Sequence, residues 1–125
     1  GGKNQTEVIQ YKMLNSYVST DDGSLGFKGT VIDLLRKEIG NPSLRDKLLQ
    51  NDKIKIFGCG PNQMLRALKN FAIENNFECE ISTEASMACG FGICQGCPIE
   101  STKDSSKYLL VCKDGPVFNV NDVVI

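Results

Sequence analysis

Four cysteines in the last third of the sequence have a spacing that could hold a metal cluster. Three belong to one short stretch, with four residues between the first and second and two between the second and third, and the fourth follows after fourteen more. They are Cys89, Cys94, Cys97 and Cys112. In the plant-type four-cysteine [2Fe-2S] site, one loop with this spacing curls around the cluster and a later strand supplies the fourth thiolate. The spacing therefore predicts a [2Fe-2S] cluster bound by these four residues.

The stretch around these cysteines has the composition that such a loop needs. Gly90, Gly92 and Gly96 let the backbone turn tightly, so that N–H groups can point toward sulfur and stabilise the negative charge of a reduced cluster. We expect three apolar neighbours to shield the cluster from water: Met87, Phe91 and Ile93.

Two other uses of the four cysteines remain open. A structural zinc ion takes four thiolates, although zinc ribbons favour two Cys-x2-Cys knuckles and this chain has one. Two disulfides would suit a secreted chain, but the N-terminus lacks the pattern of a secretory signal. A non-redox binding module held together by zinc is therefore the alternative to an electron-transfer protein.

The sequence contains no histidine. This excludes histidine general bases, histidine-containing zinc sites and Rieske-type clusters. We therefore expect any chemistry to belong to a bound cofactor.

A glycine-framed turn between a predicted strand and a predicted helix is a second candidate site. It consists of Gly58, Cys59, Gly60, Pro61 and, one turn into the helix, Met64. In open α/β sheets ligands bind at this end of the strands, where exposed N–H groups and the helix dipole favour a diphosphate or a nicotinamide. Many strand–helix turns need glycine for geometry alone, so both interpretations stay open.

Two adjacent acids, Asp21 and Asp22, follow a short β-prone run at residues 17–20. Their carboxylates could accept hydrogen bonds from both ribose hydroxyls of NAD and would repel the 2′-phosphate of NADP. A solvated turn with a capping aspartate explains them equally well.

The formal charge is −1, with acids and bases interspersed along the chain. This distribution offers no basic face to nucleic acid or to an anionic membrane. No apolar run approaches the roughly 18 residues that a membrane span requires. We therefore predict a cytoplasmic protein.

The pattern of apolar residues predicts an α/β chain. We predict helices over 5–14, 29–39, 43–49 and from Pro61 onward, and strands over 17–20, 53–57 and 77–81. Their alternation predicts a parallel layer that ends near Thr83. Residues 107–112 and 117–120 are predicted as two further strands, joined by a turn at 114–116. A lobe of about 40 residues is too small to rely on its hydrophobic core alone, which favours a metal at its centre.

Four motifs, in order along nearly the whole chain, are similar to the electron-transfer subunit of NAD-dependent dihydroorotate dehydrogenase, of the ferredoxin-NADP reductase superfamily. They are residues 19–31, Cys59-Gly60-Pro61 with Met64-Leu65, the cysteine stretch 87–97 and residues 111–118. Small subunits of bifurcating NAD-dependent ferredoxin reductases and sulfhydrogenases have similar motifs. Some of them carry aspartate at the first cluster position, where this chain has Cys89.

The resemblance implies part of a NAD-binding lobe, residues 1–83, followed by a [2Fe-2S] domain, residues 84–125. It places Asp21 and Asp22 at the ribose of NAD and the turn with Met64 at the nicotinamide. In the family an FAD barrel precedes this lobe, and the cluster relays electrons between FAD and a catalytic flavoprotein subunit that serves pyrimidine biosynthesis. We expect this chain, by itself, to hold no FAD and to be inactive with NADH. Because its strand edges are unpaired, we also expect it to pair with another copy, to rearrange its sheet or to remain loose before about Ser82.

Overall fold

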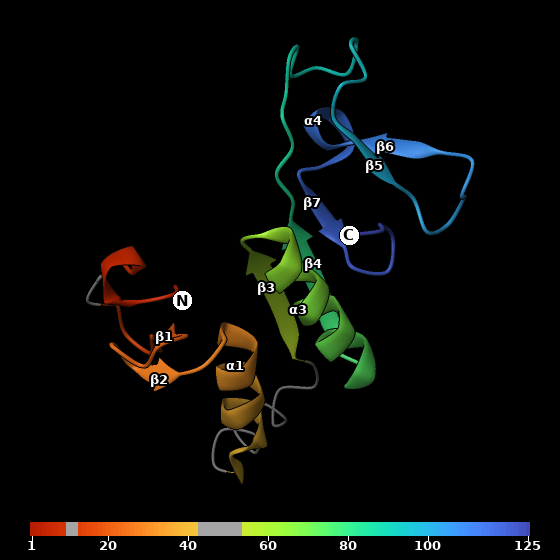
Figure 1. The fold of residues 1–125 in the computed structure, drawn as a ribbon. Helices are drawn as coiled ribbons and strands as arrows, with labels where there is room; N and C mark the ends of the chain where they lie inside the picture. The colour runs from red at the N-terminus through yellow and green to blue at the C-terminus, as the bar shows by residue number, and fades with distance from the viewer. Residues whose placement is uncertain (10–12, 43–53) are drawn as a thin grey trace. The chain divides into compact units, whose positions relative to one another are not determined.

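The computed structural model describes residues 1–9, 13–42 and 54–125, which belong to two compact units, Gly1–Asp52 and Lys53–Ile125. Each unit combines short helices with small sheets (Figure 1), so the predicted mixed α/β class is confirmed. The boundary predicted after residue 83 lies within the second unit and stays a prediction. The predicted helix at 43–49 lies outside the described residues, as do residues 10–12 of the predicted first helix and residue 53 of a predicted strand.

The first unit is held together around Thr20. Strands β1 (Ser19–Thr20) and β2 (Phe27–Lys28) pair in parallel, and the 3-10 helix η1 (Gln5–Glu7) precedes them. The Thr20 hydroxyl donates to the carbonyl of Leu25 at 2.9 Å and accepts from the N–H of Leu25 at 3.1 Å. This pair of bonds closes the turn that contains Asp21 and Asp22. The strand predicted at 17–20 is confirmed over its last two residues.

Helix α1 (Val31–Gly40) begins at a capping box. The Thr30 hydroxyl accepts from the N–H of Asp33, and the Asp33 carboxylate accepts from the N–H of Thr30, both at 3.1 Å. These bonds satisfy two backbone donors that a helix N-terminus leaves without partners. The helix predicted at 29–39 is confirmed, and it begins two residues later because Thr30 is its N-cap. Ile32 and Leu34 are its buried residues.

The second unit is built on a three-stranded sheet with the order β3-β4-β7. Strands β3 (Lys55–Cys59) and β4 (Glu78–Ser82) are parallel, and β7 (Val117–Asn119) pairs antiparallel to β4. Among the described residues, the predicted parallel layer is therefore limited to β3 and β4. Strands β1 and β2 form a separate two-stranded sheet.

Helix α3 (Asn62–Glu74) covers one face of this sheet. Its apolar stripe is buried through Leu65, Leu68, Phe71 and Ala72. A Cβ at Gly58 would clash with Leu68 Cδ2, so a larger residue there would displace the buried Leu68 side chain. The helix starts one residue later than predicted, because Pro61 is the N-cap rather than the first helical residue.

The C-terminal part of this unit differs from its prediction. Strand β6 (Tyr108–Leu110) pairs with β5 (Pro98–Glu100), which the sequence did not indicate, and the short helix α4 (Val111–Asp114) separates β6 from β7. The predicted strand at 107–112 is thus wrong beyond Leu110. The physical reason is local, because the Asp114 carboxylate accepts from the N–H of Leu110 at 2.7 Å and turns the chain there. No helix in the described part of the chain has the length and apolar character needed to cross a membrane.

Candidate metal centre

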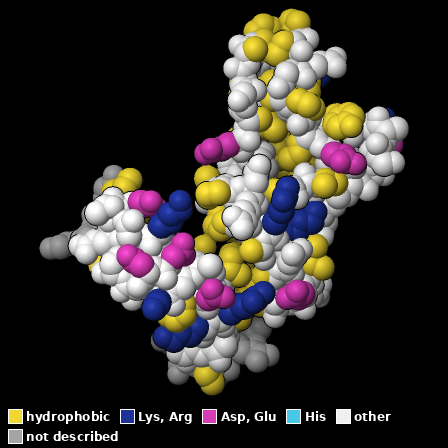
Figure 2. Space-filling view, in the orientation of Figure 1, with side chains coloured by type: hydrophobic (Ala, Val, Ile, Leu, Met, Phe, Trp, Pro, Cys, Tyr) yellow, Lys and Arg dark blue, Asp and Glu magenta, His cyan; other side chains and the backbone are white. Residues whose placement is uncertain are grey.

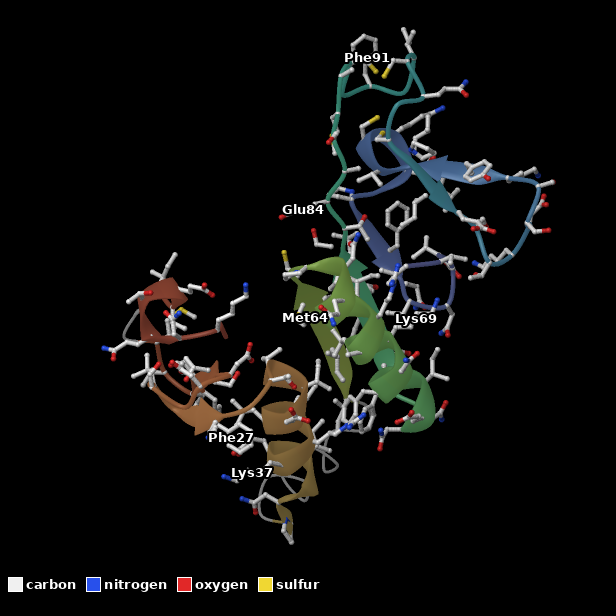
Figure 3. All side chains as sticks on the ribbon, in the orientation of Figure 1. Phe27, Lys37, Met64, Lys69, Glu84 and Phe91 are labelled. Atoms are coloured by element: carbon white, nitrogen blue, oxygen red, sulfur yellow. The ribbon has the colours of Figure 1, made fainter. Side chains whose placement is uncertain are left out.

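The cysteine loop, residues 84–97, leads from β4 to β5. In Figure 3 it extends from Glu84 at its base to Phe91 at its tip. Three of the predicted ligands, Cys89, Cys94 and Cys97, lie on this loop, and the fourth, Cys112, lies on α4. The fourth thiol therefore comes from a short helix rather than from the predicted strand.

The four thiols form two pairs. Cys94 donates its N–H to Cys89 Sγ, and Cys112 donates its N–H to Cys97 Sγ, each at 3.4 Å. A third N–H, that of Gly96, donates to Cys94 Sγ at 3.4 Å. Backbone donors thus point at sulfur, as predicted for a loop that carries negative charge.

These contacts change the acidity of the thiols. The N–H of Cys94, then that of Phe91, then the thiol of Cys94 lower the pKa of Cys89 to about 6. The pKa of Cys112 is raised, first by its hydrogen bond with the Cys97 thiol, then by burial and by the nearby charge of Cys97. A lowered thiol pKa favours the thiolate, which is the form that binds metal.

The backbone of the cysteine loop is tightly turned. Gly90 and Gly92 have φ of 76° and 88°, as expected for glycines that curl a loop, whereas Gly96 is not among the residues with positive φ. Gln95 also has a positive φ, 54°. Sequence reasoning missed Gln95, because no residue type other than glycine marks such a position reliably.

The apolar residues of the loop are exposed. Met87, Phe91 and Ile93 are 48%, 65% and 76% exposed, and Figure 2 shows apolar side chains gathered at the tip. They were expected to shield the cysteines, but in this structure they face solvent.

No three His, Cys, Asp or Glu side chains within the described ranges come close enough together to hold one metal ion. The thiols are arranged as two pairs instead. The assignment of all four cysteines as ligands of one cluster stays a prediction.

The two remaining cysteines lie apart from the cysteine loop. Cys79 is 1% exposed on β4, and burial raises the pKa of its thiol. Cys59 is exposed at the end of β3.

The predicted nucleotide turn is the β3–α3 connection. Gly60 has φ of 154°, and a Cβ there would lie 2.6 Å from Met64 Cε, so the Met64 side chain folds over the turn. Pro61 provides no side-chain cap for α3. The role of this turn in binding a nucleotide stays a prediction.

The two predicted ribose ligands lie in the first unit and differ in their contacts. Asp22 accepts from the N–H of Ser24 at 2.8 Å and from its hydroxyl at 2.6 Å, and these bonds lower the pKa of Asp22. Asp22 is thus a capping residue of its turn. Asp21 is exposed, and its N–H donates to the carbonyl of Gly2.

Known proteins match this chain, and the family match includes the cysteine loop. Residues 84–124 match the family described as the iron-sulfur cluster binding domain of dihydroorotate dehydrogenase B. The chain is 38% identical over 108 residues to the electron transfer subunit of dihydroorotate dehydrogenase B (NAD(+)) from Caldanaerobacter subterraneus, and 41% identical over 115 residues to that from Fusobacterium nucleatum. The chain is similar to these electron transfer subunits. The predicted resemblance is confirmed.

The matches to these electron transfer subunits cover 86% and 91% of this chain but 39% and 40% of the relatives. The chain thus spans about two fifths of their length. A solved structure, reported for flavin-based electron bifurcation in the NADH-dependent reduced ferredoxin-NADP oxidoreductase, matches with a TM-score of 0.62 and 29% identity. That match covers 86% of this chain and 34% of the other.

Proposed function

We propose that this chain is an electron-transfer module that carries one [2Fe-2S] cluster. The cluster relays single electrons between the FAD and NAD half of a longer parent protein and a partner subunit of the dihydroorotate dehydrogenase type. The ligands are Cys89, Cys94, Cys97 and Cys112.

One observation supports this proposal most directly. The four thiols form two pairs, and backbone N–H groups donate hydrogen bonds to their sulfur atoms. A cluster with two irons and two bridging sulfides needs two terminal thiolates on each iron. The Cys89–Cys94 pair and the Cys97–Cys112 pair would supply such a donor set. Sulfur-only donors from cysteine also suit iron–sulfur chemistry better than hard cations, which prefer oxygen.

When bound, the cluster supplies the ability to accept and release one electron at a time. The protein supplies the environment. N–H groups of Cys94, Gly96 and Cys112 donate to sulfur and stabilise added negative charge, which favours the reduced state. The glycines at 90 and 92 permit the turns that aim these donors.

The exposed tip of the cysteine loop suits contact with the partner subunit. Phe91 and Ile93 are mostly exposed there, and apolar side chains are enriched in the buried cores of protein interfaces. A short path between redox centres requires such close approach. This surface would place the cysteine loop against a catalytic flavoprotein subunit.

The nucleotide side of the proposal belongs to the parent protein. Residues 1–83 would form part of its NAD-binding lobe, and residues 84–125 its cluster domain. Asp21 would face the ribose, and the β3–α3 turn with Cys59 and Met64 would face the nicotinamide. FAD would be held by a segment of the parent outside this chain, and the complex would work in the cytoplasm.

Metal analysis tests the central claim. The 125-residue chain is purified and reconstituted without oxygen, and iron, acid-labile sulfide and zinc are measured together with the visible spectrum. We expect a red-brown protein with about two irons and two sulfides per chain. A colourless protein with one zinc, or iron without labile sulfide, would show instead that the cysteines form a different site.

A further inference from the structure

Lys113 lies against the cysteine loop, although 20 residues separate it from Gly92 in the sequence. A Cβ built on Gly92 would be 3.0 Å from Lys113 Cδ and 3.5 Å from Lys113 Cβ. The aliphatic part of the lysine therefore packs on the loop backbone between Cys89 and Cys94. Since Lys113 also follows Cys112 directly on α4, its side chain is close to both segments that supply thiols.

The cysteine loop, residues 84–97, carries one charged residue, Glu84 at its base. Residues 85–99 include no Asp, Glu, Lys or Arg. The adjacent acid, Asp114, has its carboxylate bound to the N–H of Leu110. Among the described residues, no ion pair engages Lys113 itself.

The other lysines of the same lobe have carboxylate partners. Lys103 pairs with Asp122 at 2.8 Å, and Lys107 pairs with Asp104 at 3.3 Å. Both lie in the connection between β5 and β6. Among the described lysines of residues 84–125, Lys113 is therefore the one whose side chain packs on the cysteine loop and that forms no ion pair.

We propose that Lys113 sets the reduction potential of the cluster by placing one positive charge beside the cysteine loop. This rests on the proposed function. One electron that enters the cluster adds one negative charge, and a nearby positive charge stabilises it. The charged lysine therefore favours the reduced state.

The packing of Lys113 has to be separated from its charge. The N–H of Gly92 contacts the Cys112 thiol, so a change that displaced Gly92 would also alter the thiols. Lys113→Met keeps most of the aliphatic stem and removes the charge. Lys113→Arg keeps the charge, and Lys113→Glu reverses it. Lys107→Met is the matched control, because it removes a lysine of the same lobe away from the cysteine loop.

The test is a redox titration of the reconstituted 125-residue chain, followed by visible absorbance and electron paramagnetic resonance at low and high salt. We expect Lys113→Met to lower the equilibrium constant for reduction about three- to tenfold, which is about 30 to 60 mV for one electron. Lys113→Glu should lower it further, and Lys113→Arg and Lys107→Met should match the wild type. High salt should shrink the differences, because it screens exposed charges.

The proposal is overturned if Lys113→Met carries the same cluster content as the wild type and titrates at the same potential. If Lys113→Met takes up no cluster, Lys113→Gln is titrated in its place. A lower potential than that of the wild type then supports the proposal, and an unchanged potential overturns it. A wild-type chain that takes up no iron and sulfide would instead overturn the proposed function, and the metal assay shows this before any potential is measured.

Discussion

Lys69 on α3 donates from Nζ to the backbone carbonyl of Val123 at 2.6 Å, and Val123 is fully buried. This bond attaches the C-terminal segment to the helix that covers the β3-β4-β7 sheet. The same segment bonds to β4 through Val120 and to β5 through Val124. The C-terminal segment thereby joins α3, β4 and β5 within the second unit.

Replacing Lys69 with methionine should lower the free energy of unfolding by about 1 to 2 kcal/mol, because a partly buried hydrogen bond from a charged donor is lost. Urea denaturation of the 125-residue chain measures this. Lys107→Met, which breaks a surface ion pair, is the control and should change stability by less than about 1 kcal/mol. Equal effects of the two changes would show that the Val123 contact has no special role.

Replacing Cys94 with alanine should abolish the visible absorbance of the reconstituted protein and loosen residues 84–125, since metal binding and folding of a small lobe are coupled. Hydrogen exchange with mass spectrometry reports the loosening. Cys59→Ser is the matched control, because Cys59 is an exposed cysteine outside the cysteine loop, and it should keep the cluster. Loss of the cluster in both variants would contradict the ligand assignment.

The capping box of α1 predicts a pH dependence. The Thr30 side chain, then its N–H, lowers the pKa of Asp33 below its usual value of 3.8. Because the folded-state pKa is the lower one, this contribution to stability is complete above the unfolded pKa and is lost as pH falls through the folded pKa. Asp33→Ala should therefore lower the melting temperature at neutral pH, and the difference from the wild type should shrink in acid. Circular dichroism measures both, with Glu38→Ala on the same helix as the control.

The parent protein should prefer NADH to NADPH, and Asp21 should contribute more to that preference than Asp22, whose carboxylate is bound to Ser24. Asp21→Ser removes a charge that repels a 2′-phosphate and should raise kcat/KM with NADPH roughly tenfold relative to NADH. Steady-state kinetics with both nucleotides measures the ratio. A larger change for Asp22→Ser than for Asp21→Ser would reverse the assignment.

The cysteine spacing and the two amphipathic helices could be read from the sequence, because both depend on local order along the chain. Ligands on one loop keep their spacing in any fold, and the stripe of Leu65, Leu68 and Phe71 follows the helical repeat. The glycines at 90 and 92 were predicted for the same reason, since their backbone conformation is a local property.

Only the tertiary structure decided which strands pair and which side chains meet. Strand β7 joins β4 because Phe118 is buried opposite Ile81, a contact between residues 37 positions apart that no local pattern contains. The Asp114 carboxylate converts the expected strand end into α4. That short helix brings Lys113 onto Gly92, and this is a consequence of chain packing rather than of sequence spacing.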